Sequence, residues 1–213
     1  MPSTNHFFDM RTYKIHLIRH GEYEGAEEGR YVGHTDLPLS EEGRAEALQL
    51  KEDEIYPKAA SVFTSPLIRC RQTAEILYPD AEAVDMPGFI ECNFGEFENM
   101  TAADLRDNED FAGWLAGKNA PPFGESSADF GKRVCSCFET LADGMMKSGV
   151  FDVAVITHAG VIAALLSAYG LPQAPMHEWR TPYCCGYTLL LDPTVWMRGK
   201  KAEVFALIPE SRD

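Results

Sequence analysis

The strongest constraint on the fold of this chain is the apolar run Asp152–Thr157 (DVAVIT), which a second apolar, helix-like segment follows. A strand that is apolar at successive positions is buried on both faces, which is typical of parallel sheets. Residues 13–18 (YKIHLI) and Ser61–Thr64 (SVFT) are two further short β-rich runs. Parallel strands need long crossover connections, and helical segments lie between these strands. The sequence therefore predicts an α/β fold of three layers, α/β/α, around a mostly parallel central sheet.

Start and stop signals place helices between the strands. Ser40 is followed by Glu41 and Glu42, a pattern typical of an N-cap with acids in the first turn. Pro66 fits the first turn of the next helix. The predicted helices are residues 41–51, 66–77, 127–147 (with Ser126 or Ser127 as N-cap) and 160–169. Further extended segments are predicted at residues 89–91, 187–191 and 202–208.

Residues 92–125 differ in texture from the rest of the chain. They carry scattered acids and aromatic residues and end near Pro121 and Pro122. Within them, Thr101 and Asp104 resemble a capping box. A chain of 213 residues fits one domain better than two. We therefore interpret residues 1–213 as a single domain in which about residues 92–125 form an inserted helical cap.

The charge balance excludes several classes of partner. The chain has 33 acidic and 19 basic residues and a net charge of −14. Such a surface repels nucleic acid and anionic lipid, so we expect neither nucleic acid nor a membrane as partner. No apolar run is long enough to span a bilayer, and the start of the chain lacks the apolar core of a secretory signal. We expect a cytoplasmic protein and leave its oligomeric state open, a homodimer included.

The cysteines and histidines form no metal motif. None of the six cysteines forms a CxxC pair or is followed six positions later by arginine. This removes zinc-binding, thioredoxin-type and cysteine-phosphatase interpretations. His16 and His20 are four residues apart on a predicted strand, a spacing with poor metal geometry. We expect no metal and no other cofactor, and we assign no role to the adjacent Cys184 and Cys185.

Basic side chains closely follow three of the predicted strands. They are two arginines and two histidines: Arg19, His20, Arg69 and His158. The carboxyl ends of parallel strands meet at one edge of a sheet, where function collects in open α/β folds. An acidic chain needs such a local basic site if its substrate is a phosphate ester.

These residue types fit phosphoryl transfer. That reaction mainly requires in-line positioning and neutralisation of charge on the phosphate oxygens. Arginine pairs bidentately with phosphate, so Arg19 and Arg69 are interpreted as a clamp with His158 as a further donor. A neutral imidazole is a competent nucleophile near pH 7, which is the role predicted for His20. A backbone carbonyl near Gly21 would keep one ring nitrogen protonated and leave the other to attack.

Glu91 is the predicted proton donor to the leaving group. It follows an apolar stretch and opens the proposed cap, which would desolvate it and raise its pKa. In the second half of the reaction the same carboxylate would accept a proton from the attacking water. The nearby Glu22, Glu96 and Glu98 are interpreted as solvated acids, and His34 as a surface residue.

Six ordered sequence blocks resemble the histidine phosphatase superfamily, also called the phosphoglycerate mutase-like fold. The blocks are residues 17–22 (LIRHGE), 33–40 (GHTDLPLS), 65–74 (SPLIRCRQTA), 91–98 (ECNFGEFE), 122–126 (PFGES) and 157–160 (THAG). The resemblance covers about residues 13–195. It implies a phosphohistidine at His20, a phosphate site formed by Arg19, Arg69 and His158, Glu91 as proton donor, and no metal.

The match to the family pattern has gaps. We expect Gly21, Thr35 and Ala159 to line the substrate site, although Thr35 is also interpretable as a turn residue. The family often has serine or threonine after the glutamate of the first block and a phosphate-binding asparagine three residues later. This chain has Tyr23 and Ala26 there, so the site loses one donor.

The leading hypothesis is a histidine acid-type phosphatase, a phosphomonoester hydrolase acting on a small phosphorylated metabolite. Within the family, the blocks resemble alpha-ribazole phosphatases and broad small-ester phosphatases most. One alternative is a phosphoglycerate mutase-type phosphotransferase, which would need basic residues for the substrate carboxylate, whereas residues 92–125 are mostly acidic. The other is a non-catalytic module that retains a phosphate site.

Overall fold

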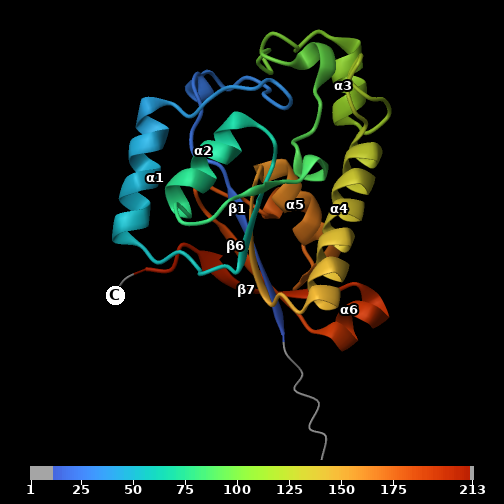
Figure 1. Ribbon diagram of the computed structural model, residues 1–213. Coiled ribbons are helices and arrows are strands. Elements are labelled where there is room, and N and C mark those ends of the chain that lie inside the picture. The colour runs from blue at the N-terminus through green and yellow to red at the C-terminus, as the bar shows by residue number, and fades with distance from the viewer. Residues whose placement is uncertain (1–11, 212–213) are drawn as a thin grey trace, which may run out of the picture.

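A computed structural model describes residues 12–211 as a β-sheet between two layers of helices (Figure 1). Within these residues the sheet has seven strands in the order β3-β2-β4-β1-β6-β7-β5. Their bounds are β1 Tyr13–Arg19, β2 Ser61–Thr64, β3 Val84–Asp85, β4 Asp152–Thr157, β5 Gly170–Leu171, β6 Gly186–Leu191 and β7 Ala202–Ile208. The three-layer α/β fold predicted from the sequence is confirmed.

The directions of the strands bring three strand ends together. β6 runs antiparallel to β1 and β7, whereas the pairs β1–β4, β2–β4, β2–β3 and β5–β7 are parallel. Arg19 at the end of β1 is in register with Thr157 at the end of β4. Thr64 at the end of β2 pairs with Ile156 of β4. The carboxyl ends of β2, β4 and β1 therefore lie side by side at one edge of the sheet.

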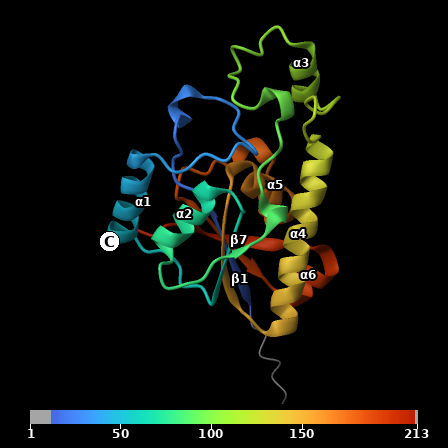
Figure 2. The ribbon, with the colours of Figure 1, turned by 45° about the horizontal axis from the view of Figure 1, so that its top comes forward.

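Helices cover both faces of the sheet. Their bounds are α1 Glu41–Asp53, α2 Ile68–Leu77, α3 Glu109–Leu115, α4 Ser127–Ser148, α5 Ala159–Tyr169 and α6 Pro193–Gly199. Figures 1 and 2 show α1 and α2 on one side of the sheet and α4 and α5 on the other. The central strand β4 is thus buried from Val153 to Thr157, as a parallel strand covered on both faces requires, whereas Phe205 and Leu207 of β7 are exposed.

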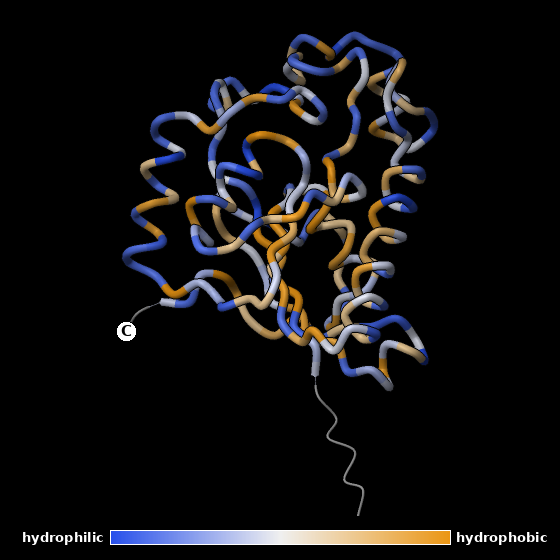
Figure 3. The backbone as a smooth tube through the Cα atoms, in the orientation of Figure 1, coloured by the Kyte–Doolittle hydropathy of each residue, from blue (hydrophilic) through white to orange (hydrophobic). Residues whose placement is uncertain are grey.

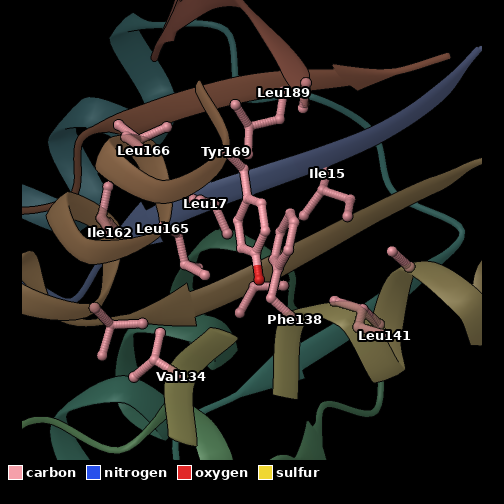
Figure 4. Close-up of a cluster of buried hydrophobic side chains, with 14 of the residues drawn as sticks. Ile15, Leu17, Val134, Phe138, Leu141, Ile162, Leu165, Leu166, Tyr169 and Leu189 are labelled. Atoms are coloured by element: carbon pink, nitrogen blue, oxygen red, sulfur yellow. The ribbon is translucent and has the colours of Figure 1, made fainter. Parts of the chain in front are cut away.

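Each face of the sheet has its own apolar core. On the side of α4 and α5, the rings of Phe138 and Tyr169 stack with centroids 5.3 Å apart, near Leu17 of β1 (Figure 4). On the side of α1 and α2, Ala47 and Cys70 belong to a second buried cluster. Figure 3 shows hydrophobic residues concentrated along the central strands and alternating with hydrophilic ones along α1. This alternation leaves one face of α1 for the core and the other for solvent.

Two predicted helix starts are confirmed and one is wrong. Ser40 and Ser126 N-cap α1 and α4 through their side-chain oxygens, as predicted. Pro66 lies before α2, which begins at Ile68. The Ile68 N–H donates to the Asp36 carboxylate at 2.7 Å. A cap that comes from a distant loop leaves no signal in the local sequence.

The extended segment predicted at residues 89–91 is not a strand. The chain forms a 3-10 helix at Pro87–Phe89, immediately before Glu91. Arg133 on α4 donates to the carbonyl oxygens of Gly88 and Ile90 at 3.0 and 2.9 Å. A side chain thus takes the acceptors that a neighbouring strand would otherwise use. The short β3, β5 and α6 were not predicted, because segments of this length carry little periodic pattern.

Residues 92–125 lie at the end of the molecule toward which β1 runs, at the top of Figure 1. Phe97, Leu105 and Phe111 form a small buried cluster there, separate from the two main cores. Thr101 N–H donates to Asp104 Oδ2 at 2.8 Å, and Asp104 N–H donates to Thr101 Oγ1 at 3.1 Å. These are the bonds of a capping box, but the residues that follow form turns and not a helix.

None of the helices among residues 12–211 has the length and hydropathy needed to cross a membrane. Residues 1–11, which carry most of the segment used to predict the absence of a secretory signal, lie outside the described residues.

Candidate active site

The three strand ends hold the basic residues expected from the sequence. The His20 N–H, directly after β1, donates to the Thr157 carbonyl oxygen at 2.9 Å. His158, which follows Thr157 in the chain, is therefore held beside His20. The centroids of the two rings are 5.1 Å apart. Ser65, directly after β2, donates its N–H to Ile156 of β4 at 2.9 Å. The sheet thus brings segments from three distant parts of the sequence to one place.

The His20 ring is buried and fixed in orientation. Its Nδ1 lies 2.7 Å from the Gly21 carbonyl oxygen, an acceptor, so Nδ1 carries the proton and Nε2 is the basic nitrogen. Burial lowers the pKa of His20 well below 6.5, and the charges of Arg69 and Arg19 lower it further. A neutral ring with a free Nε2 is the form that acts as a nucleophile.

Arg69 is fully buried in α2, with an exposed fraction of 0%. It donates to the carbonyl oxygens of Thr35 and Gly33 at 2.9 and 2.8 Å, and its Nε has no partner. Within residues 12–211 it forms no ion pair with a carboxylate. A buried guanidinium without a carboxylate favours an anionic ligand beside it.

Arg19 resembles Arg69 in that its guanidinium donates to a backbone carbonyl and not to a carboxylate. Its NH1 donates to the Thr181 carbonyl oxygen at 2.8 Å, and its Nε is buried without a partner. The guanidinium carbon lies 3.9 Å from the centroid of the Tyr183 ring. A cation over an aromatic face is stabilised without being neutralised. Arg19 therefore keeps its positive charge available, and together with Arg69 it forms the local basic site that the acidic chain requires.

His158 completes the basic group. It precedes α5, and its exposed fraction is 1%. Its Nε2 lies 2.8 Å from the Ser65 hydroxyl oxygen and 3.5 Å from the Cys70 sulfur. Burial and the neighbouring His20 lower the pKa of His158 well below 6.5. Ala159 follows as the first residue of α5, and its methyl side chain has no polar group.

Glu91 joins the same site from the start of the 92–125 segment. Its carboxylate accepts the N–H of Cys92 at 2.9 Å and the N–H of Gly160 at 3.0 Å. Burial raises the pKa of Glu91 above 4.5, although these two bonds and the arginines oppose the shift. A side chain at position 160 would overlap the Glu91 carboxylate, so the glycine permits this contact. Burial, and not the bond to Gly160, favours the protonated form that a general acid needs.

The contacts of Thr35 and Glu98 differ from those expected for a substrate-binding hydroxyl and a solvated acid. The Thr35 hydroxyl donates to Glu98 Oε2 at 2.6 Å, and Thr35 contacts Arg69 through its carbonyl oxygen. It is a turn residue whose hydroxyl is already engaged, which was one of the two interpretations. Glu98 is not a solvated acid. It is half-buried, and hydrogen bonds from Thr35, His34, Gly33 and Phe94 lower its pKa although burial opposes this.

Tyr23 from the loop after β1, and Tyr183 and Cys184 from the loop before β6, make contacts that the sequence did not reveal. The rings of Tyr23 and Tyr183 lie 5.8 and 5.9 Å from the His20 ring. Cys184 is buried in a left-handed conformation with φ 57°, and its N–H donates to the His20 carbonyl oxygen at 3.3 Å. This bond fixes the backbone of His20 against the loop before β6. A lone tyrosine or cysteine in a loop carries no motif, so only the structure shows these contacts.

The two histidines considered for zinc, His16 and His20, have different partners. His16 contacts Thr188 and Asp152 through its two ring nitrogens, at 2.9 and 2.6 Å, and not His20. Over residues 12–211 no group of three or more His, Cys, Asp or Glu side chains is arranged to hold a metal ion.

Known proteins share this arrangement of motifs. The model of the histidine phosphatase superfamily (branch 1) matches residues 15–198. The chain belongs to this superfamily. An adenosylcobalamin/alpha-ribazole phosphatase of Salmonella typhimurium is 30% identical over 179 residues, covering 81% of this chain and 87% of that protein. A 2,3-bisphosphoglycerate-dependent phosphoglycerate mutase 2 of Gloeobacter violaceus is 30% identical over 159 residues, covering 70% and 72% of the two chains.

Solved structures of the superfamily have the same fold. The crystal structure of the alpha-ribazole phosphatase from Shigella flexneri superposes with a TM-score of 0.77 at 25% identity, covering 91% of this chain and 95% of that one. The resemblance inferred from the six sequence blocks is therefore confirmed at the level of the superfamily. Its relatives include both hydrolases and mutases.

Proposed function

We propose that this protein is a phosphomonoester hydrolase that transfers the phosphoryl group of a small phosphorylated metabolite to His20 Nε2 and then to water. The observation that carries the proposal is the setting of one ring. Its Nδ1 is bound to the Gly21 carbonyl oxygen, while Arg19 and Arg69 act on it as uncompensated positive charges. This arrangement prepares both a nucleophile and a site for the anion that it attacks.

The first half-reaction moves the phosphoryl group to the protein. His20 Nε2 attacks phosphorus, the bond from phosphorus to the ester oxygen breaks, and protonated Glu91 gives its proton to that oxygen. Arg19 and Arg69, whose charges act on the His20 ring, neutralise the charge on the phosphate oxygens. In the second half-reaction, Glu91 accepts a proton from water while water displaces His20 from phosphorus, which releases inorganic phosphate.

Glu91→Gln is expected to slow the hydrolysis of alkyl phosphates by about 10²–10⁴-fold, the usual contribution of a general acid. Alkoxide leaving groups need a proton, whereas nitrophenolate leaves without one. For p-nitrophenyl phosphate we therefore expect a loss of less than about tenfold. Steady-state kinetics with both esters measure the difference. Equal loss of kcat/KM for the two substrates would show that Glu91 does not protonate the leaving group, because kcat/KM reports the transfer to His20 and not the later attack of water.

The pH profile of kcat/KM is expected to depend on the same two groups. His20 must be neutral, and its lowered pKa keeps it neutral well below pH 6.5, so activity extends into acidic solution. Glu91 must be protonated, and its raised pKa, above 4.5, sets the alkaline limb. Because the ionisation of the substrate is common to both enzymes, wild type and Glu91→Gln are compared with one alkyl ester. An alkaline limb that is the same in Glu91→Gln speaks against this assignment.

The assay that separates hydrolase from mutase uses 3-phosphoglycerate with a 2,3-bisphosphoglycerate primer, alongside a panel of phosphorylated metabolites. We expect release of inorganic phosphate from at least one metabolite and no isomerisation of 3-phosphoglycerate. Isomerisation without free phosphate would overturn the hydrolase proposal. The panel also identifies the substrate, since the similar alpha-ribazole phosphatases and phosphoglycerate mutases differ in theirs.

A further inference from the structure

One carboxylate of the 92–125 segment gathers the amides of a distant turn. Glu98 accepts the N–H of Gly33 at 3.0 Å, of His34 at 2.9 Å and of Thr35 at 3.2 Å. It also accepts the Thr35 hydroxyl at 2.6 Å and the N–H of Phe94 at 3.1 Å. Hydrogen bonds to an ionised group are the strong ones, and here successive amides of one turn share a single acceptor.

The opposite side of the same turn faces Arg69. The carbonyl oxygens of Gly33 and Thr35 accept from the two terminal nitrogens of its guanidinium. The turn at residues 33–35 therefore lies between a negative and a positive side chain, with its N–H groups toward Glu98 and its carbonyls toward Arg69. The Gly33–His34 peptide is bonded at both ends, with its N–H to Glu98 and its C=O to Arg69, so the two charges polarise it in the same sense and the two bonds support one another.

The packing around the turn leaves little freedom for other arrangements. Gly33 is buried, and a side chain there would overlap both the Cys92 carbonyl oxygen and the Glu98 carboxylate. Arg69 has no other acceptor among the described residues for its terminal nitrogens. The position of its guanidinium thus depends on where these two carbonyls lie.

We propose that Glu98 is a positioning residue that acts through the 33–35 turn to hold Arg69 in the geometry that binds the phosphoryl group. The inference rests on the proposed function, because that function assigns Arg69 to the phosphate. Losing the carboxylate leaves the turn amides without their shared acceptor, and the turn relaxes away from Arg69. A guanidinium that must be re-ordered when the ligand binds gives weaker binding than one held in place.

The lowered pKa of Glu98 agrees with this role. Burial alone would raise the pKa, but the bonds from the Thr35 hydroxyl and the backbone amides outweigh burial and keep the carboxylate ionised. The competing explanation is that Glu98 only fastens the 92–125 segment to the rest of the protein. That explanation predicts a loss of stability without a specific effect on phosphate.

The test compares Glu98→Gln with Glu96→Gln. Glutamine keeps the shape of the side chain but offers one acceptor oxygen and no charge, and Glu96 is an exposed acid two residues away. We measure the Kd for inorganic phosphate by calorimetry and the melting temperature of each protein. Glu98→Gln is expected to bind phosphate about tenfold more weakly, while Glu96→Gln matches the wild type. If Glu98→Gln does not fold, Thr35→Val removes the shortest of the bonds and is expected to weaken phosphate binding about threefold.

A double-mutant cycle with Arg69→Lys separates positioning from fastening. If Glu98 acts through Arg69, Glu98→Gln changes the Kd little once Arg69 is already lysine. Additive effects on the Kd, or a wild-type Kd in Glu98→Gln and in Thr35→Val, would overturn the inference. Absence of phosphate binding by the wild type would instead contradict the proposed function, so the two failures are distinguishable.

Discussion

His20→Ala is expected to lower kcat for phosphomonoester hydrolysis by about 10⁴-fold or more, since loss of a covalent nucleophile removes the reaction path itself. The structure gives this residue no substitute. His158, the nearest imidazole, has its Nε2 2.8 Å from the Ser65 hydroxyl and 3.5 Å from the Cys70 sulfur. Phosphate-release kinetics with p-nitrophenyl phosphate measure the loss.

The matched control for this experiment is His177→Ala, because His177 is exposed on the surface in a short 3-10 helix. It is expected to keep wild-type kcat. Inorganic phosphate is expected to bind His20→Ala within about tenfold of the wild type, because both arginines remain. A His20→Ala enzyme that retains more than about a tenth of the wild-type kcat means that another group attacks phosphorus.

Arg69→Lys is expected to lower kcat/KM by about 10²–10³-fold, the usual effect of removing a preorganised donor to developing charge. Lysine keeps the positive charge but ends in a single ammonium group. Its one nitrogen cannot take the places of the two separate guanidinium nitrogens that donate to the Thr35 and Gly33 carbonyls, so the planar fork that pairs bidentately with phosphate is lost. Steady-state kinetics on the purified variant check this.

Arg71→Lys is the control for Arg69→Lys. Arg71 lies on the same helix but is exposed and pairs with Asp85 of β3, not with an acid of α2. Exposed ion pairs contribute little to stability, so we expect Arg71→Lys to have the kinetics and the stability of the wild type. Because Arg69 is fully buried, the melting temperature of Arg69→Lys is measured as well. A drop in kcat/KM that disappears when folded protein is counted would remove Arg69 from the phosphate site.

Much of the arrangement was predictable because it depends on local patterns. β1, β2, β4, β6 and β7 are short β-rich runs, and parallel strands put their carboxyl ends together. From that rule alone, His20 and His158 were expected to meet, and their rings are 5.1 Å apart. The Gly21 carbonyl was expected to fix the tautomer, and it lies 2.7 Å from Nδ1.

The supports of the two arginines were not predictable. Glu98 was interpreted as a solvated acid because an acid among other acids is usually solvated, and the amides of Gly33, His34 and Thr35 that bind it lie more than 60 residues earlier in the chain. Tyr183 and Cys184 likewise act through contacts set by tertiary packing, which leaves no periodic or spacing signal. Sequence patterns identified the groups suited to chemistry, whereas the turns that hold them required the structure.

The acidic character of the chain gives these supports their importance. A protein with a net charge of −14 repels a phosphate ester over most of its surface. We therefore propose that phosphate binding depends on Arg19 and Arg69, which are held by neutral carbonyls and an aromatic ring and not by carboxylates. Any substitution that gives either arginine a carboxylate partner is expected to weaken phosphate binding.

The most direct test of the account is to trap the phosphorylated protein. Wild type and His20→Ala are mixed with a ³²P-labelled substrate of the hydrolase, quenched in alkali, and examined for protein-bound label that is stable in base and lost in acid. The account predicts such label on wild type, mapped to the peptide that contains His20, and none on His20→Ala. Rapid phosphate release by wild type without bound label, or label that persists in His20→Ala, would contradict it.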